Sequence, residues 1–323
     1  MAGASNQLNH KCAMHGRLNG SGILAGMAGT WTVLLLAALA GGRVASIDFF
    51  GHGGMDLPRV RALLPLRVGD RTPLGREGEI ARAIGHGARV SAVCCDERGD
   101  YYVFIGLAGT TAREIRFHPV PSGSARLPGQ GLELYGRLME LLAEAVRKGV
   151  AREDRSRGYA LNDYAPMKAT QLEMRAYALR HPRELREVLA SAADARQRMA
   201  AAQLLGYAEE SDEQIAALAA AAHDADETVR NNATRALGVL AERDPATARK
   251  IPAAPFIDLL KSTTWTDRNK ALMVLVPVTE ARDPATLRLL RREAFDALQE
   301  MADWSSSYRE PARLVLERIG AVE

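Results

Sequence analysis

Aromatic residues are scarce in this chain of 323 residues, where Phe, Trp and Tyr together make up 5%. Cysteine is rarer still and occurs only at positions 12, 94 and 95. So few cysteines exclude a small fold held together by a framework of disulfides. Alanine, leucine and arginine are plentiful instead, which is typical of packed helices. The length is sufficient for two or three domains, each with its own core.

Cys94 and Cys95 are neighbours in a β-rich run, so their side chains should point to opposite faces of a strand. That arrangement places them poorly for pairing with each other. We therefore expect one buried thiol and one exposed thiol. An intermolecular disulfide in an oxidising compartment is the alternative.

Acidic residues are absent from residues 1–46, which carry Lys11, Arg17 and Arg43. Without these three, the rest of the chain has 39 basic and 39 acidic side chains and is formally neutral. It contains no continuous basic stripe with interleaved aromatics. We therefore expect no nucleic-acid partner.

An uncharged, largely apolar run covers residues 23–40 and is followed by small residues. This pattern predicts a secretory signal peptide within residues 1–46, with cleavage after Ala40 or Ser46. The alternative is an uncleaved anchor in the inner membrane, because a run of this length also spans a bilayer. Either way, we expect the rest of the chain in the periplasm or cell envelope, with membrane contact only through this segment if it is uncleaved.

Residues 47–118 have a mixed pattern. Strands are expected at 47–50, 89–95 and 101–107, and helices at 57–64 and 77–84. A turn-rich segment separates the last two strands and predicts a hairpin. The order β-α-α-β-β predicts a small α+β domain.

The segments Ile47-x-Phe-Phe-Gly51 and Val60 to Asp70, together with the closing hairpin, resemble a POTRA domain. The resemblance implies an exported module that binds extended segments by adding a strand to its sheet edge. No outer-membrane barrel follows here, so it does not carry over the family's usual role in barrel assembly.

Beyond this domain the pattern becomes helical. Residues 119–130 are rich in Pro, Gly and Ser and are predicted to be a linker. A helical connecting region is expected at 131–190. Residues 191–323 contain a fragment that recurs four times, at spacings of 32, 38 and 41 residues between equivalent arginines. Periods of this length are typical of stacked helical pairs.

The recurring fragment reads cap-x-x-x-Arg-x-x-Ala-x-x-apolar-Leu. The expected N-caps are Asp194, Asp226, Thr264 and Ser305, and the arginines are Arg198, Arg230, Arg268 and Arg309. Residues 226–238 closely resemble the short form of the HEAT repeat. This resemblance implies an all-α HEAT-like solenoid and an arginine ladder between adjacent repeats. The expected fold is therefore a mainly α, multi-domain chain with the small α+β domain in front of the solenoid.

Several polar residues stand out as candidates for binding a partner. Asn231 and Asn232 lie in mid-helix, where asparagine has poor helix propensity. They indicate either a polar contact on the concave face, together with Arg235, or bonding between repeats. Glu153, Asp154 and Tyr159 lie in a non-repeating stretch that suits either a binding site or a turn held by salt bridges.

The sequence contains no nucleophile, metal-ligand or phosphate-loop motif. We therefore expect no enzyme activity, metal or cofactor. The predicted function is that of an exported, non-catalytic scaffold or adaptor that binds a protein partner. The alternative is a bilin-lyase-like enzyme acting on a chromophore-binding protein, because short HEAT-like repeats also occur in that family.

Overall fold

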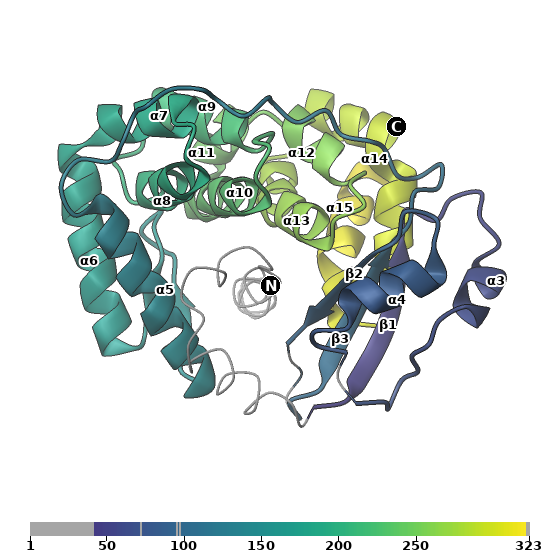
Figure 1. Ribbon diagram of the computed structural model, residues 1–323. Helices are drawn as coiled ribbons and strands as arrows, with labels where there is room; N and C mark the ends of the chain where they lie inside the picture. Colours follow the sequence, from purple (N-terminus) through teal and green to yellow (C-terminus); the bar gives the residue numbers. More distant parts are fainter. Residues whose placement is uncertain (1–41, 72, 95, 97, 321–323) are drawn as a thin grey trace.

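The computed structural model describes residues 42–71, 73–94, 96 and 98–320. The described part is mainly helical, with one three-stranded sheet and one two-stranded ribbon (Figure 1). All but the last five residues of the predicted leader, 1–46, lie outside this range. Every helix in the described part of the chain is too short or too polar to span a bilayer.

The small domain has the expected order of elements. These are β1 (Val44–Phe50), α3 (Leu57–Ala62), α4 (Glu77–Ile84), β2 (Arg89–Val93) and β3 (Tyr101–Gly106). The strands lie in the order β1-β3-β2, with β1 parallel and β2 antiparallel to β3, so the predicted hairpin is confirmed. The first strand begins at Val44 rather than at the expected residue 47. Val44 and Ser46 are buried and pair with β3.

The central strand β3 is buried along its whole length because both faces of the sheet are covered. Val103 and Ile105 face the core formed with α3 and α4. Tyr102 and Phe104 alternate with them and belong to the core of the helical part. This double burial explains why the strand is a continuous apolar run rather than an alternating one.

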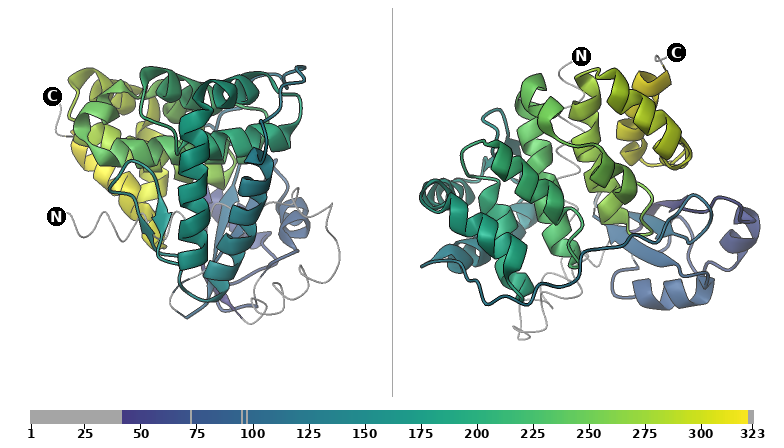
Figure 2. Two further views of the ribbon diagram at one scale, coloured as in Figure 1. Left: turned by 90° about the vertical axis from the view of Figure 1, so that its left-hand side faces the viewer. Right: turned by 90° about the horizontal axis from the view of Figure 1, so that it is seen from above.

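Helices make up most of the rest of the described chain, and all but the first two of them pack in two rows (Figures 1 and 2). They are α5 (Gly131–Arg147), α6 (Ala165–Arg180), α7 (Pro182–Ser191), α8 (Ala195–Leu205), α9 (Asp212–Ala221), α10 (Glu227–Arg243), α11 (Pro245–Lys250), α12 (Ala254–Leu259), α13 (Trp265–Glu280), α14 (Pro284–Ala302) and α15 (Glu310–Gly320), with a 3₁₀ turn at Ser307–Arg309. In one row, α8 packs on α10, α10 on α13 and α13 on α15. The other row contains α7, α9, α11, α12 and α14 (Figure 1).

Two of the four predicted N-caps form. Asp194 accepts a bond from an amide in the first turn of α8, and Asp226 accepts bonds from two amides of α10. Thr264 occupies the N-cap position of α13 but makes no side-chain capping bond. The prediction for Ser305 is wrong, because Ser305 donates to the carboxylate of Asp48 in β1. A contact between distant segments has displaced the local capping bond.

Aromatic side chains join the sheet to the helices. The ring of Phe104 lies 5.1 Å from that of Trp265, 5.0 Å from Trp304 and 5.4 Å from Tyr308. Phe50 adds an edge contact to Trp304 at 6.0 Å. Aromatic pairs of this kind contribute about 0.5–1.5 kcal/mol each beyond the burial of their area. The small domain is therefore packed firmly against the C-terminal helices.

Two carboxylates complete this junction. Asp48 accepts bonds from the backbone amides of Ser305 and Ser306. From the opposite side, Glu300 on α14 accepts the amides of Gly51 and His52 at 2.7 and 3.1 Å. Each half of the chain thus supplies an acid that satisfies buried amides of the other half.

Residues 113–128 form an extended segment, here called the strap, that crosses the ends of the helical pairs (Figure 1). The linker predicted at 119–130 lies largely within the strap, which is bonded to the helical part. At every fifth residue a strap amide donates to a backbone carbonyl of the helical part: Arg113 to Lys261 at 2.8 Å, His118 to His223 at 2.7 Å and Gly123 to Ser191 at 2.9 Å. Lys261 lies in the loop between α12 and α13 and His223 in the loop between α9 and α10, while Ser191 is the last residue of α7, next to the loop before α8.

Strap side chains alternate between the helices and solvent. Ile115, Phe117 and Ala125 pack against the helical core, whereas Arg116 and Ser124 are exposed. An extended chain with period-two burial behaves like a strand laid on a surface. The strap is therefore part of the folded structure although it contains no regular secondary structure.

Gly106 allows the close approach at the junction. A Cβ at this position would lie 2.1 Å from the carbonyl oxygen of Thr263 and 2.7 Å from the Phe50 ring. We expect Gly106→Ala to destabilise the protein by about 1–3 kcal/mol, because neither backbone nor packed ring can move freely. Gly136 in α5 is the control, since a Cβ there meets nothing within 4 Å. Gly136→Ala should stabilise by about 0.5–1 kcal/mol. Thermal melting of both variants tests this expectation, and an unchanged Tm for Gly106→Ala would contradict it.

Candidate functional site

The structure places three of the predicted binding residues in the interior of the helical part. Asn231, Asn232 and Arg235 on α10 are only 4%, 1% and 7% exposed. The amide of Asn232 donates to the Met199 carbonyl of α8 at 3.1 Å and to the hydroxyl of Tyr135 at 3.3 Å. This is the inter-helix bonding that the sequence offered as the alternative to a polar contact on an open face. Such buried side chains leave little surface for a partner.

Glu153 lies close to Arg235, although the two are far apart in sequence. A guanidinium nitrogen of Arg235 lies 2.6 Å from both carboxylate oxygens of Glu153. Arg155 contacts the same carboxylate at 3.3 Å and reaches Glu242 at 3.3 Å. Two arginines and two glutamates thus form a buried cluster that ties the ribbon of β4 (Glu153–Asp154) and β5 (Leu161–Asn162) to α10. Burial raises the pKa of Glu242, and Arg155 only partly opposes this effect.

The remaining two predicted residues lie at the edge of this cluster. Asp154 is exposed and accepts the amide of Ser156, a bond that lowers the pKa of Asp154. Tyr159 is half-buried, with the Arg175 guanidinium 4.8 Å from its ring centre. The cavity beside Arg235 has a volume of about 10 Å³, which is barely enough for one water molecule. The cluster is therefore suited to holding elements together rather than to receiving a substrate.

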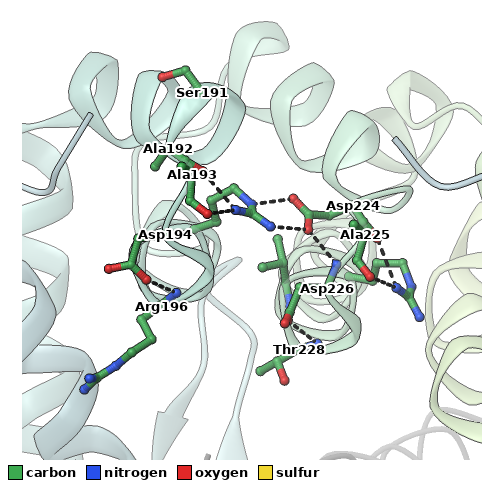
Figure 3. A network of polar contacts seen from close by, with 12 residues as sticks. Ser191, Ala192, Ala193, Asp194, Arg196, Asp224, Ala225, Asp226 and Thr228 are labelled. Carbon is green, nitrogen blue, oxygen red and sulfur yellow. Dashed lines mark hydrogen bonds and ion pairs between the residues drawn. The ribbon is translucent and has the colours of Figure 1, made fainter. Parts of the chain in front are cut away.

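The arginine ladder is present in the first two repeats. Arg198 on α8 makes a bidentate contact with Asp224 at 2.8 and 2.9 Å. Arg230 on α10 makes a second bidentate contact, with Asp267 on α13 at 2.9 and 3.1 Å. Each arginine also donates to the carbonyls five and six residues before it. In Figure 3, Asp224 lies between Ala193 and Asp226, and Asp226 donates its own amide to the Asp224 carboxylate.

The ladder changes at the third arginine. Arg268 is fully buried and donates to the Ser262 carbonyl, while the acid that it faces, Glu300, lies 3.7 Å away. Burial lowers the pKa of Arg268 to about 10, so the side chain remains charged at neutral pH. Its guanidinium lies 4.8 Å from the Phe50 ring centre, at the junction with the small domain. The ladder prediction is wrong for Arg309, which is partly exposed and pairs with the adjacent Glu310.

The two edges of the small sheet differ. On β1, Trp304 donates its indole N–H to the carbonyl of Phe49 at 3.0 Å, and Val44 bonds to Gly69 and Asp70. On β2, the described part of the chain supplies no hydrogen bond to the outer edge. The β1 edge is therefore covered, whereas the β2 edge is accessible only at its start, where Arg89 is exposed and Val90 partly exposed, because Ala92 is 0% exposed.

The hydrogen-bond alternation identifies which groups of β2 point outward. The amides of Tyr101 and Leu107 both donate toward β1, so those of the intervening even-numbered residues point toward β2. Phe104 pairs with Ser91 in β2. The backbone N–H and C=O groups of Val90 and Ala92 consequently point away from the sheet. The sequence predicted that an edge would be available but could not show which one.

Cys94 is disulfide-bonded, so the expectation of a free thiol there is wrong. The other two cysteines, Cys12 and Cys95, lie outside the described residues. Within residues 42–320, masked positions apart, no group of three His, Cys, Asp or Glu side chains is arranged to hold a metal ion.

Removing one ladder arginine tests its structural role. We expect Arg230→Ala to destabilise by about 3–5 kcal/mol, because Asp267 would remain buried without its partner. Arg309→Ala is the matched control, and loss of its surface pair should cost less than about 1 kcal/mol. Urea unfolding of the two variants measures the difference. Equal midpoints would show that the ladder does not stabilise the helical stack.

His223 makes the strap contact sensitive to pH. Burial lowers the pKa of its imidazole below the ordinary 6.5, and His118 and Arg230 add to the effect while Asp258 opposes it. The unfolded chain therefore binds a proton more readily than the folded one, so stability should be lost as the pH falls below about 6.5. We expect the decrease in Tm between about pH 7.5 and 5.5 to be smaller in His223→Gln than in the unsubstituted protein. An identical decrease in both would contradict this assignment.

Comparison with known proteins yields little. No protein-family model matches the chain, and no curated protein matches it. Among solved structures, an engineered protein from the Northeast Structural Genomics Consortium is similar over 59% of this chain and 88% of its own, with 16% identity and a TM-score of 0.39. A likeness this distant says nothing about what the chain does.

Proposed function

We propose that the chain is an exported scaffold of the bacterial cell envelope that binds a protein partner. In this proposal a HEAT-like solenoid carries a POTRA-like domain, and the open β2 edge takes up an extended segment of the partner. The observation that carries the proposal is the contrast between the two edges of the sheet. The β1 edge is bonded to the turn at Gly69–Asp70 and to Trp304. On β2, no hydrogen bond from the described part of the chain reaches the outward groups of Val90, which is partly exposed, whereas Ala92 is 0% exposed.

An open strand edge is a binding surface for another extended chain. Main-chain hydrogen bonds supply the affinity in such complexes, and alternate side chains supply the specificity. Val90 offers one outward donor and one outward acceptor, as the next strand of an antiparallel sheet would require, whereas Ala92 is fully buried. Natural proteins usually protect long open edges, so an unprotected edge favours a role in binding.

The contacts between helices support the solenoid part of the proposal. Arg198 with Asp224 and Arg230 with Asp267 are both bidentate pairs to the next helical pair, although Asp224 precedes the N-cap of α10 and Asp267 follows that of α13. The contact that recurs at one register is the donation of each arginine to the carbonyls five and six residues before it, as a quasi-one-dimensional stack requires. The burial of Asn231, Asn232 and Arg235 moves the proposed partner contact from α10 to the sheet edge.

Export is proposed from the leader sequence, and β1 bears on where cleavage would occur. Cleavage after Ser46 would remove Val44 and two further residues of a strand that pairs with β3. Cleavage after Ala40 would leave β1 whole. Of the two positions, Ala40 is the one compatible with the folded domain.

Site-specific photocrosslinking in the source cells tests the proposed function. A photoreactive amino acid at the exposed Arg89, in β2, should give a discrete adduct with a partner protein. The same group at Leu63, which is exposed after α3, should not give this adduct. Introducing Val90→Pro beside the probe should reduce the adduct about tenfold, since loss of an outward N–H removes about 1.4 kcal/mol of binding free energy.

Val90→Thr is the matched control because it keeps the backbone N–H and the β-branched shape. Circular dichroism and the Tm of each variant establish that it is folded. Adducts of equal yield from Arg89 and Leu63, or from Val90→Pro and Val90→Thr, would rule out the β2 edge as the binding surface.

A further inference from the structure

A cavity of about 690 Å³ opens between α14, Lys261 and the turn at residues 110–113. Its volume is within the range of 300–1,000 Å³ typical of ligand sites. It is here called the α14 groove, and its lining comes from three segments that are far apart in the sequence. The α14 groove lies apart from β2 and does not depend on the proposal for the sheet edge.

The charge of the α14 groove is predominantly positive. Four basic side chains line it, Arg113, Lys261, Arg291 and Arg292, against two acidic ones, Glu293 and Asp296. The chain after residue 46 is formally neutral, so this excess is local. Concave surfaces lined by one sign of charge focus the electrostatic field and attract ligands of opposite charge.

The ion pairs in the α14 groove are weak enough for another carboxylate to replace the present one. Glu293 contacts Arg292 at 2.9 Å and Lys261 at 3.6 Å, while Arg113 contacts Asp258 at 3.4 Å. In three of these five residues the side chain is at least 41% exposed. Exposed pairs contribute at most about 1 kcal/mol, so a carboxylate from another molecule can compete for the same cations.

Phe295 gives the α14 groove an apolar anchor. Its side chain is 46% exposed and lies one helical turn beyond Arg291 and Arg292 on the same helix. Arginine and aromatic residues are enriched among the residues that dominate binding at protein interfaces. Guanidinium groups beside an exposed ring suit a ligand that combines carboxylates with an apolar side chain.

The geometry points to the α14 groove as a docking site for an acidic peptide segment of a protein partner. Carboxylates of the segment would pair with Arg291, Arg292 and Lys261, and an apolar side chain would pack on Phe295. A protein segment is favoured over nucleic acid because the cations form a single short cluster rather than a continuous track along which a phosphate backbone could run.

Fluorescence anisotropy with a labelled octapeptide tests this inference. The probe contains glutamates around a central phenylalanine, and its comparison peptide has glutamine in place of each glutamate. We expect the glutamate peptide to bind the full-length chain and to bind more weakly as salt is raised. Arg291→Glu combined with Arg292→Glu should weaken binding at least tenfold, and Phe295→Ala should weaken it about threefold or more.

Arg180→Glu combined with Arg183→Glu is the matched control. These two side chains are also exposed, and their reversal changes the net charge by the same amount. Binding should stay within about twofold of the unsubstituted protein. Val90→Pro should also leave binding unchanged, which separates the α14 groove from the β2 edge.

Any one of five outcomes would overturn the inference. The peptide does not bind, the glutamine peptide binds as well, the control double variant loses as much affinity as the α14 double variant, or Val90→Pro abolishes binding. Tighter binding of a thymidine oligonucleotide of equal charge would assign the α14 groove to phosphates instead and would also overturn it.

Discussion

The packing of Phe104 against Trp265, Trp304 and Tyr308 is the contact on which the arrangement of the whole chain depends. A chain with 5% aromatic residues places six of them at this one junction, namely Phe50, Tyr102, Phe104, Trp265, Trp304 and Tyr308. Large rings bury much area with little loss of side-chain entropy, so a few of them can hold two units together. With the sheet fixed against the last helices, the strap that leaves β3 must run back along the whole row to reach α5.

Within the row, charge pairs rather than rings set the register. Arg198 and Arg230 each bind an acid of the next helix pair and two carbonyls of their own loop. A planar guanidinium can satisfy all of these acceptors at once only in one orientation. The pattern changes at Arg268, which lies 3.7 Å from Glu300 of the next helical pair and also contacts Phe50 of the small domain. The bidentate arginine–aspartate pairing of the stacked helices thus ends where they meet the small domain.

Local features of the fold could be predicted from the sequence, and contacts between distant segments could not. The caps at Asp194 and Asp226 depend on residues within one helical turn, and the hairpin of β2 and β3 depends on one short turn. The burial of Asn231 and Asn232 depends on α5 and α8, about 30 to 100 residues away along the chain. The strap has the composition of a linker, and its backbone bonds are made to other segments rather than within itself. Its composition alone therefore could not show that it is held in place. The α14 groove was missed for the same reason, since its cations come from three separate segments.

The strap also restricts how such a chain can change its length. Its bonded amides are five residues apart, whereas the loops that accept them are separated by whole helical pairs. Because both ends of the strap are anchored, an added helical pair would require about five more strap residues to preserve the bonding register. Removal of a helical pair would leave about five strap residues in excess. The number of repeats and the length of a segment more than sixty residues upstream of them are therefore linked, and a redesign that alters one has to alter both.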